Sequence, residues 1–249
     1  MHKVLILSDW QIPYHDKQVL NAVRKFAQSW QPNEVIYNGD ILDFPQLTTK
    51  YERRRLTEND IRLDIKEFRD VHDGFRSACP RARYVLLPGN HEARAERLVL
   101  ERADGLEGLL ADELSLPNLL ASPGLEVRGN YLNGTAYWER GGLIVTHGDV
   151  TDLKAMARDW GSVVMGHTHR EAVYAYSSRQ GLERIPHKAV SSGALCKTGI
   201  GGPPATRKTE IKDWTQGFVV AWFDSRGYQV LPITIVDGSF IGPDGVRYA

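Results

Sequence analysis

Five short motifs in the sequence each place metal-binding side chains directly after a run of apolar residues. They are Asp9-Trp10-Gln11, Gly39-Asp40-Ile41-Leu42-Asp43, Gly89-Asn90-His91-Glu92, Thr146-His147-Gly148-Asp149 and Gly166-His167-Thr168-His169. Their carboxylate, amide and imidazole groups are oxygen and nitrogen donors that suit manganese, iron or zinc better than a thiolate site would. Together the motifs supply enough ligands for two divalent metal ions.

A pair of divalent ions suits the hydrolysis of a phosphate ester. Two ions about 3.5–4 Å apart neutralise the phosphoryl oxygens and acidify a bridging water, which then attacks phosphorus. Such a pair needs one shared carboxylate, with further oxygen and nitrogen ligands on either side. The five motifs contain these side chains.

The elements that must position these motifs follow from the apolar pattern. Buried strands are predicted at Val4–Leu7, Val35–Tyr37, Tyr84–Leu87, Leu143–Thr146 and Val163–Met165. Between the first three strands, helices are predicted at Lys17–Ser29 and from a start near Thr57 and Asp60 to Cys79-Pro80. This β-α-β-α-β order predicts a mostly parallel sheet, with ligands beyond the carboxyl ends of its strands.

The apolar residues beyond Met165 alternate more, which predicts a second, more antiparallel sheet. Its expected strands are Val173–Tyr176, Lys188–Val190, Phe218–Phe223 and Tyr228–Val236. With no clear linker, residues 1–249 are predicted to form a single domain.

Three connecting segments have patterns of their own. Residues 93–120 are predicted to form a helical, cap-like insertion beside the site. Asn133-Gly134 predicts a hairpin turn between Tyr131-Leu132 and Thr135–Trp138. Lys197–Trp214, with its Gly-Gly-Pro-Pro run and basic residues Arg207 and Lys208, predicts a mobile loop.

The composition limits the classes of protein that fit. Lys and Arg total 31, and Asp and Glu also total 31, which argues against a protein that mainly coats nucleic acid. Cys79 and Cys196 are the only cysteines and predict two free thiols. The N-terminus does not resemble a signal peptide and no apolar run approaches a membrane span, so we expect a cytoplasmic protein.

The five motifs, in this order and spacing, resemble those of the calcineurin-like metallophosphoesterases, in particular small single-domain types compatible with a bacterial or phage origin. The match spans residues 8 to 170. The resemblance implies an α/β fold, a four-layer α/β/β/α sandwich of two mixed sheets. It also implies a cofactor of two divalent metal ions, with manganese expected and iron, zinc or nickel as alternatives.

The resemblance implies a role for each motif residue. Asp9, Gln11 and His169 would bind the first metal, and Asp40 would bridge both metals. Asn90, His147 and His167 would hold the second. His91 would act on the leaving-group oxygen as proton donor or charge stabiliser, with Asp43 orienting its ring. Glu92 would hold the motif loop by hydrogen bonds.

Several other residues have competing interpretations. Asp149 is expected to cap a helix over Thr151–Arg158 rather than bind metal. Arg94 and Arg170 could contact a substrate phosphate or be ordinary solvated charges. His15 is not expected to be a ligand, because it lies six residues after Asp9.

Gln11 departs from the family pattern, because a metal-binding histidine is usual at its position. An amide oxygen is a weaker donor than an imidazole nitrogen. The hypothesis is that the first site is weaker, exchanges its metal readily and makes activity depend on added manganese. Transfer of a diester or monoester preference from the family is uncertain for the same reason.

Four functions fit the residues to different degrees. The favoured one is a phosphodiesterase for small or cyclic nucleotide diesters, acting by attack of metal-bound hydroxide. A DNA nuclease of the recombination-repair type is an alternative that zero net charge disfavours. A phosphomonoesterase or protein phosphatase is another, although Phe44 stands where protein phosphatases have arginine. The fourth is a degenerate scaffold without catalysis, for which Gln11 is the only reason.

Overall fold

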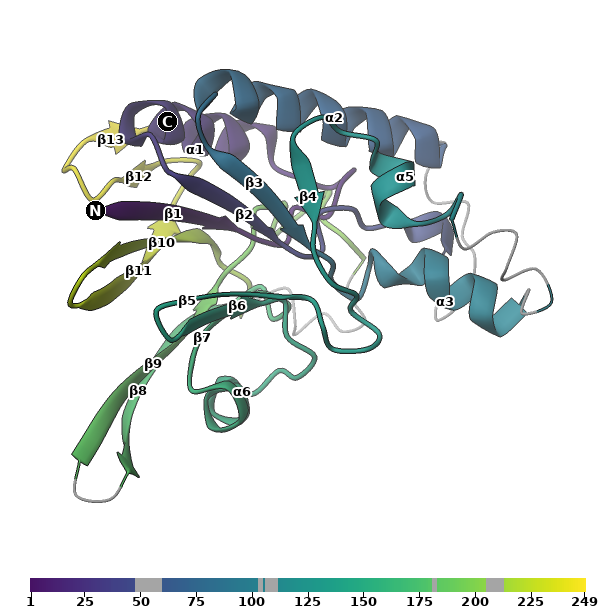
Figure 1. Cartoon of the computed structure of the whole chain (residues 1–249). Helices are drawn as coiled ribbons and strands as arrows, with labels where there is room; N and C mark the ends of the chain where they lie inside the picture. The colour runs from purple at the N-terminus through teal and green to yellow at the C-terminus, as the bar shows by residue number, and fades with distance from the viewer. Residues whose placement is uncertain (48–59, 103–104, 106–111, 181–182, 205–212) are drawn as a thin grey trace.

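Two mixed β-sheets form the middle of the molecule, and helices cover their outer faces (Figure 1). The computed structural model describes residues 1–47, 60–102, 105, 112–180, 183–204 and 213–249. Within these residues the layers are helix, sheet, sheet and helix. The predicted four-layer α/β/β/α architecture is therefore confirmed.

The first sheet has six strands in the order β11-β10-β1-β2-β3-β4. Their bounds are β1 His2–Leu7, β2 Glu34–Asn38, β3 Arg83–Leu87, β4 Leu125–Val127, β10 Gln216–Asp224 and β11 Gly227–Ile235. Strands β1 to β4 pair in parallel, whereas β10 is antiparallel to both β1 and β11. Helices α1 (Lys17–Trp30) and α2 (Ile61–Ala78) lie over its outer face (Figure 1).

The second sheet has five strands in the order β5-β6-β7-β9-β8. Their bounds are β5 Tyr137–Arg140, β6 Leu143–Thr146, β7 Ser162–Met165, β8 Glu171–Gln180 and β9 Glu183–Ser192. Helix α6 (Leu153–Trp160) packs on its outer face through Met156 and Ala157. A short pair, β12 (Phe240–Ile241) and β13 (Arg247–Tyr248), packs beside α1.

Alternation along the strands divides the core between the layers. In β1, Leu5 and Leu7 belong to the cluster that contains the buried faces of α1 and α2, including Phe26 and Phe68. Val4 and Ile6 belong instead to the cluster between the two sheets. Successive strand residues point to opposite faces, so a continuously apolar strand is buried on both sides. Among the described helices, none is both long and apolar enough to cross a membrane.

The sequence predicted the positions of the strands better than their partners. Phe218–Phe223 and Tyr228–Val236 were assigned to the second sheet, but as β10 and β11 they extend the first sheet beside β1. The second sheet instead begins earlier, at β5. Alternation reports which face of a strand is buried, not which strand lies beside it, so it could not predict this pairing.

One local prediction, a hairpin turn, needs correction, and two others lie partly outside the described residues. Tyr131–Gly134 forms a turn, so Tyr131-Leu132 is not a strand of a hairpin; the hairpin joins β5 to β6 through Gly141-Gly142. Helix α2 begins after Asp60, whose carboxylate accepts a hydrogen bond from the Arg62 N–H. Thr57 and residues 205–212, which include the basic pair of the predicted mobile loop, lie outside the described residues.

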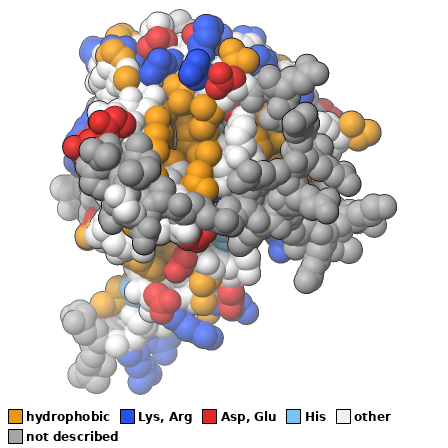
Figure 2. Space-filling view, turned by 90° about the vertical axis from the view of Figure 1, so that its right-hand side faces the viewer, with side chains coloured by type: hydrophobic (Ala, Val, Ile, Leu, Met, Phe, Trp, Pro, Cys, Tyr) orange, Lys and Arg blue, Asp and Glu red, His pale blue; other side chains and the backbone are white. Residues whose placement is uncertain are grey.

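The region of the expected cap contains helices α3 (Ala93–Arg102), directly after the third motif, and α5 (Leu116–Leu120). A cavity of about 280 Å³ lies between them and is lined by apolar side chains such as Val99, Leu116 and Leu119. Figure 2 shows hydrophobic side chains gathered on this side of the molecule. Glu92, Ala93 and Tyr131 also line the cavity, so it adjoins the third motif.

Candidate metal centre

Both sheets deliver motif residues to one edge of the sandwich. Asp9, Asp40 and Asn90 follow β1, β2 and β3, which are parallel neighbours in the first sheet. His147 and His167 follow β6 and β7, which are parallel neighbours in the second. The carboxyl ends of parallel strands meet at one edge, and here two such edges face each other.

The backbone of these motifs adopts an uncommon conformation. Asp9, Gln11, Asp40, His167 and His169 all have φ between 51° and 68°. Side chains other than glycine rarely occupy this left-handed region, and such residues gather where surrounding contacts over-determine the backbone, as at functional sites. The turn after each strand therefore aims its side chain back into the space between the sheets.

Two motif glycines are required by the close approach of these side chains. A Cβ on Gly39 would lie 2.6 Å from the His147 ring, and Gly39 itself has a φ of 75°. A Cβ on Gly89 would collide with the Asp40 carboxylate. Any larger residue at either position would displace a predicted ligand.

Asp9, Gln11 and His169 lie together, as predicted for the first half-site. The His169 Nε2 is 3.1 Å from Asp9 Oδ1, and the Gln11 Nε2 is 3.4 Å from the same imidazole nitrogen. The His167 backbone N–H donates to the Asp9 carboxylate at 3.1 Å. All three side chains are buried.

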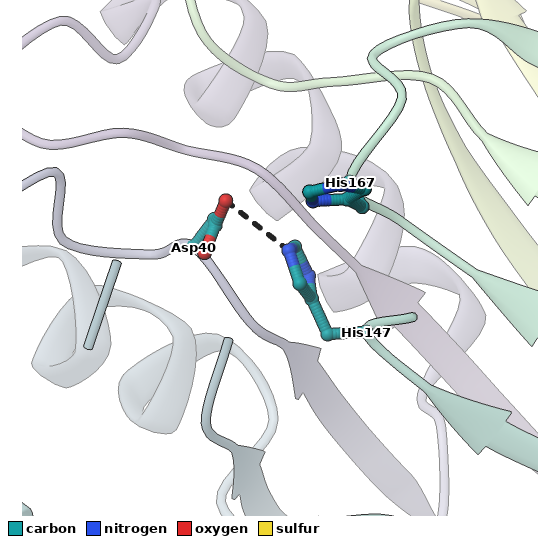
Figure 3. A group of neighbouring side chains, drawn as sticks. All are labelled: Asp40, His147 and His167. Carbon is teal, nitrogen blue, oxygen red and sulfur yellow. Dashed lines mark ion pairs between the residues drawn. The ribbon is translucent and has the colours of Figure 1, made fainter. Parts of the chain in front are cut away.

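Asp40 lies next to the second group of predicted ligands (Figure 3). Its Oδ2 is 3.1 Å from the His147 Nε2. Ligand atoms of Asp40, His147 and His167 all lie within 4.8 Å of one another. Asn90 completes the group, since its Oδ1 is 2.8 Å from the His167 Nδ1.

The second ring nitrogen of His147 has an orienting partner. The His147 Nδ1–H donates to the Asn38 backbone carbonyl at 2.8 Å, which leaves Nε2 directed at Asp40. A metal-binding histidine usually donates its other N–H in this way, and the bond fixes the tautomer.

Glu92 holds two motif loops together, as the sequence predicted. Its buried carboxylate accepts hydrogen bonds from the backbone N–H groups of Asp40, Ile41, Leu42 and Gly89 at 2.7–2.9 Å. Burial and the Asp40 charge raise the pKa of Glu92, while the donors from Leu42 and Gly89 oppose that rise. Four N–H donors require an acceptor, which favours the ionised carboxylate.

His91 and Asp43 also form the predicted contact. The His91 Nδ1 lies 2.7 Å from Asp43 Oδ1, and the His91 backbone N–H donates to Asp40 Oδ1 at 2.9 Å. The His91 Nε2 is 3.6 Å from Asp40 Oδ2. The ring therefore borders the metal centre, with one nitrogen held by a carboxylate.

The electrostatics of this edge are those of a cation site. Burial alone would raise the pKa of Asp40, yet the imidazoles of His147 and His91 hold it well below its usual range. Burial alone would lower the pKa of His147, but the Asp40 carboxylate raises it to about 9. Asp9 likewise overcomes burial and raises the pKa of His169 well above its usual range. In the absence of metal ions, the raised pKa values favour protonated His147 and His169, whose positive charges face the carboxylates of Asp40 and Asp9.

The donor set fits divalent metal ions. The Gln11 Oε1 is buried and has no hydrogen-bond partner in the described part of the chain. Buried polar atoms are nearly always paired, so an unpaired buried oxygen on a side chain whose amide nitrogen contacts Asp40 and His169 is consistent with a site that takes a further group. Carboxylate, amide and imidazole donors suit manganese, iron or zinc.

Metal binding should release protons. In the metal-free protein His147 has a pKa of about 9, so at pH 7 a proton competes with metal for its Nε2. The apparent affinity should therefore rise as pH increases from 6.5 to 8.5, by up to about tenfold per pH unit for each proton released. Calorimetric titration with Mn²⁺ in buffers of different ionisation enthalpy measures this release. His187→Gln, a change far from the site, should behave like wild type; a pH-independent affinity would contradict the prediction.

The structure shows the environment of the residues for which the sequence allowed competing interpretations. Asp149 does not cap the following helix, because Asp152 does so by accepting from the Lys154 N–H at 2.8 Å. Arg170 is 44% exposed and pairs with Asp213 at 3.7 Å, as a surface charge.

His15 faces Glu67 at 3.2 Å, away from the metal-ligand cluster. Cys79 and Cys196 are both free and buried, as predicted.

Arg94 lies at the site. It is 16% exposed at the side chain, and its Nη2 is 3.1 Å from the His91 Nε2. The sequence alone did not distinguish a contact with substrate from a solvated charge at Arg94.

Two further neighbours of the site could not be found from the sequence. The Cys196 Sγ lies 4.0 Å from the His169 Nδ1, and the Trp214 ring meets the His169 ring edge-on at 4.2 Å. Neither residue belongs to a motif, and both are far from His169 along the chain. Only the tertiary fold brings them there.

Two phage proteins and one solved structure are similar to this chain over most of their length. The gene 54 protein of Mycobacterium phage L5 is 26% identical over 255 residues, covering 96% of this chain and 95% of its own. The gene 54 protein of Mycobacterium phage D29 is 27% identical over 252 residues, with the same coverage. A solved structure of Vps29 from Entamoeba histolytica complexed with Zn²⁺ is 14% identical, with a TM-score of 0.47, and covers 96% of this chain and 95% of that one.

A family model describes most of the chain. The model of calcineurin-like phosphoesterases matches residues 2–180, which include all five motifs, β1 to β8 and every predicted ligand. Metal-dependent hydrolysis of a phosphoester is the activity that this family implies. With this match, and with its predicted ligands gathered between two sheets around Asp40, the chain belongs to the calcineurin-like phosphoesterases.

Proposed function

We propose that this protein is a binuclear-metal phosphodiesterase for small nucleotide diesters, including cyclic ones. The observation that supports this most directly is the central position of Asp40. Its Oδ2 lies 3.2 Å from the Gln11 Nε2 and 3.1 Å from the His147 Nε2. One carboxylate oxygen thus lies between two groups of ligands, as a bridging ligand must.

The proposed ligands divide at Asp40. Asp9, Gln11 and His169 hold the first metal, and Asn90, His147 and His167 hold the second. When bound, the two ions neutralise the phosphoryl oxygens and supply an acidified water. Manganese is the proposed metal, with iron, zinc and nickel as alternatives.

His91 is the proposed proton donor to the leaving alcohol. Its ring borders the proposed metal centre: the Nδ1 lies 2.7 Å from Asp43 Oδ1, and the Nε2 lies 3.6 Å from Asp40 Oδ2 and 3.1 Å from the Arg94 Nη2. General acid catalysis of this kind contributes about 10²–10⁴-fold to a rate.

A small organic ester is favoured over a long nucleic acid. The chain has a net charge of zero, so it lacks the basic excess that phosphate-rich polymers recruit. The cavity of about 280 Å³ that adjoins the third motif is lined mainly by apolar side chains and could accept the organic part of such an ester. A single domain over residues 1–249, a cap over residues 93–120 and a cytoplasmic location stay predictions.

Gln11 should make the first metal site the weaker one. An amide oxygen is neutral and donates less strongly than imidazole nitrogen, so Gln11→His should tighten the weaker of two Mn²⁺ sites by about tenfold, or about 1.4 kcal/mol. Calorimetry gives the two affinities, and elemental analysis gives the metal content after dialysis. Gln28→His adds a histidine on the exposed face of α1 and serves as control. Equal affinities in all three proteins would exclude this role for Gln11.

A substrate panel with Mn²⁺ tests the proposed function. It compares bis-p-nitrophenyl phosphate, p-nitrophenyl phosphate, cyclic nucleotides, and labelled single- and double-stranded DNA. Faster turnover of small diesters than of monoesters or DNA is the expected result. Preferential cleavage of DNA would replace the proposal with a nuclease, and preference for monoesters would replace it with a phosphomonoesterase. Metal binding without turnover of any ester would indicate a non-catalytic scaffold.

A further inference from the structure

Strand β8 lies at the edge of the second sheet, and its outer side pairs with no other strand that the structure describes. It is ten residues long. Together with β9 it extends beyond the four-residue β7, away from the rest of the sheet (Figure 1). An open edge of this length presents a row of backbone N–H and C=O groups to which another strand can bond.

The other edges of the two sheets are protected against such pairing. β4 has only three residues and β5 only four, and each includes charged side chains. β11 is longer, but Pro232 lies within it and has no N–H to donate. Short length, charge and proline all discourage the addition of a further strand.

β8 lacks these features over most of its length. The segment from Ala172 to Ser178 contains no charged residue and no proline. It pairs with β9 in one unbroken register, without a bulge. Val173 is 49% exposed. A long, uncharged and partly apolar edge promotes aggregation when it is left open, so we expect this one to be covered in the native protein.

A contact of Glu171 shows which backbone groups of β8 face outward. Its N–H donates to the Thr215 Oγ1 at 2.7 Å and not to β9. Hydrogen bonding alternates between the two sides of an antiparallel strand, so Val173, Ala175 and Ser177 present their N–H and C=O groups to the open edge. Among the described residues, no loop or turn backbone bonds to these groups.

β8 is complementary to itself about a two-fold axis through Ala175. In antiparallel pairing with a second copy, Tyr174 of each copy lies opposite Tyr176 of the other, on one face of the joined sheet. The two tyrosines already stack within one chain, with ring centroids 5.4 Å apart. Cross-strand aromatic pairs stabilise a sheet, so this stack would continue across the axis.

The other face of the same pairing brings opposite charges together. The acidic Glu171 of each copy lies opposite the exposed, basic Arg179 of the other. Opposite charges directly across two strands are favourable, and the symmetry makes this pair occur twice. A register shifted by two residues would lose it.

We propose that a second copy of this chain covers the open edge of β8. The two five-stranded sheets then join into one continuous sheet across a two-fold axis, with main-chain hydrogen bonds between the two β8 strands. The interface contains none of the proposed metal ligands, so this inference does not depend on the proposed function.

The mass in solution tests the pairing. Analytical ultracentrifugation of the wild type at about 1–100 μM should show a dimer of the 28.0 kDa chain. Ala175→Pro removes an N–H that faces the open edge and not β9, so the chain can still fold and should become monomeric. Val173→Lys places a charge on the edge and should weaken the dimer by about tenfold or more.

A matched variant separates the edge from a general effect of charge. Leu231→Lys makes a similar change at a 40% exposed residue of β11, an edge strand of the first sheet, and should remain dimeric. Thermal unfolding checks that each variant is folded. A monomeric wild type, or a dimer that persists in both β8 variants, would overturn the inference.

Cross-linking tests the register directly. Opposite residues of antiparallel strands have Cα atoms about 4.5–5.5 Å apart, a separation that a disulfide spans. Ala175→Cys should therefore give a disulfide-linked dimer when diamide is added, since native Cys79 and Cys196 are buried. Ser177→Cys should not, because its counterpart lies about 14 Å along the strand. Equal cross-linking of both variants, or of neither, would overturn the proposed pairing.

Discussion

Asp40→Asn should abolish phosphoesterase activity, with a loss of about 10³-fold or more in kcat. Asp40 lies between the two groups of ligands, with Oδ2 close to Gln11 and His147. An amide in its place is neutral and offers one oxygen instead of two. The proposed metals contribute several kcal/mol of charge stabilisation in the transition state, which corresponds to about three powers of ten.

The same substitution should also lower metal content. Both proposed half-sites share this carboxylate, so elemental analysis should find less than one equivalent of Mn²⁺, against the two equivalents expected for wild type. Asp73→Asn changes an aspartate that is 62% exposed on α2 and should retain full activity and metal. Thermal unfolding of the metal-free proteins checks that Asp40→Asn still folds. A folded Asp40→Asn protein with two metals and normal turnover would refute the bridging role.

Glu92→Gln should destabilise the protein by about 3 kcal/mol, the second large effect that we expect. Four backbone N–H groups, from Asp40 to Leu42 and from Gly89, converge on the two carboxylate oxygens. A glutamine keeps one oxygen and turns an NH₂ group toward the remaining donors. Buried donors without an acceptor lose about 1–3 kcal/mol each.

Denaturant and thermal unfolding measure this loss. For a chain of this size, about 3 kcal/mol corresponds to a decrease in Tm of roughly 6–12 °C. Glu101→Gln makes the same chemical change at an exposed position of α3 and should leave Tm unchanged. Because Glu92 joins the loops that carry Asp40 and Asn90, Mn²⁺ affinity should fall as well. An unchanged Tm would mean that these hydrogen bonds do not hold the loops.

The sequence by itself determined the chemistry of the site and the elements that carry it. A strand buried on both faces is a local, continuous apolar run, so Val4–Leu7, Val35–Tyr37 and Tyr84–Leu87 could be located without a structure. The proposed metal ligands follow these runs within a few residues, and their chemical types indicate hard or borderline divalent ions. The departure at Gln11, where the family pattern has histidine, could be seen in the sequence because it is a difference in residue type.

Only the tertiary structure shows the strand pairing and the side-chain neighbours that depend on contacts between distant segments. β10 pairs with β1 across more than 200 residues, and no local pattern encodes that choice. The left-handed backbone at Asp9, Asp40 and His167 is accompanied by hydrogen bonds to distant segments, from the Asp9 N–H to Gly39, from the Asp40 N–H to Glu92 and from the His167 N–H to Asp9. Arg94 was ambiguous because a solvated arginine and one bonded to His91 have the same sequence context. Its contact with His91, like the approach of Cys196 and Trp214 to His169, is seen only in the folded structure.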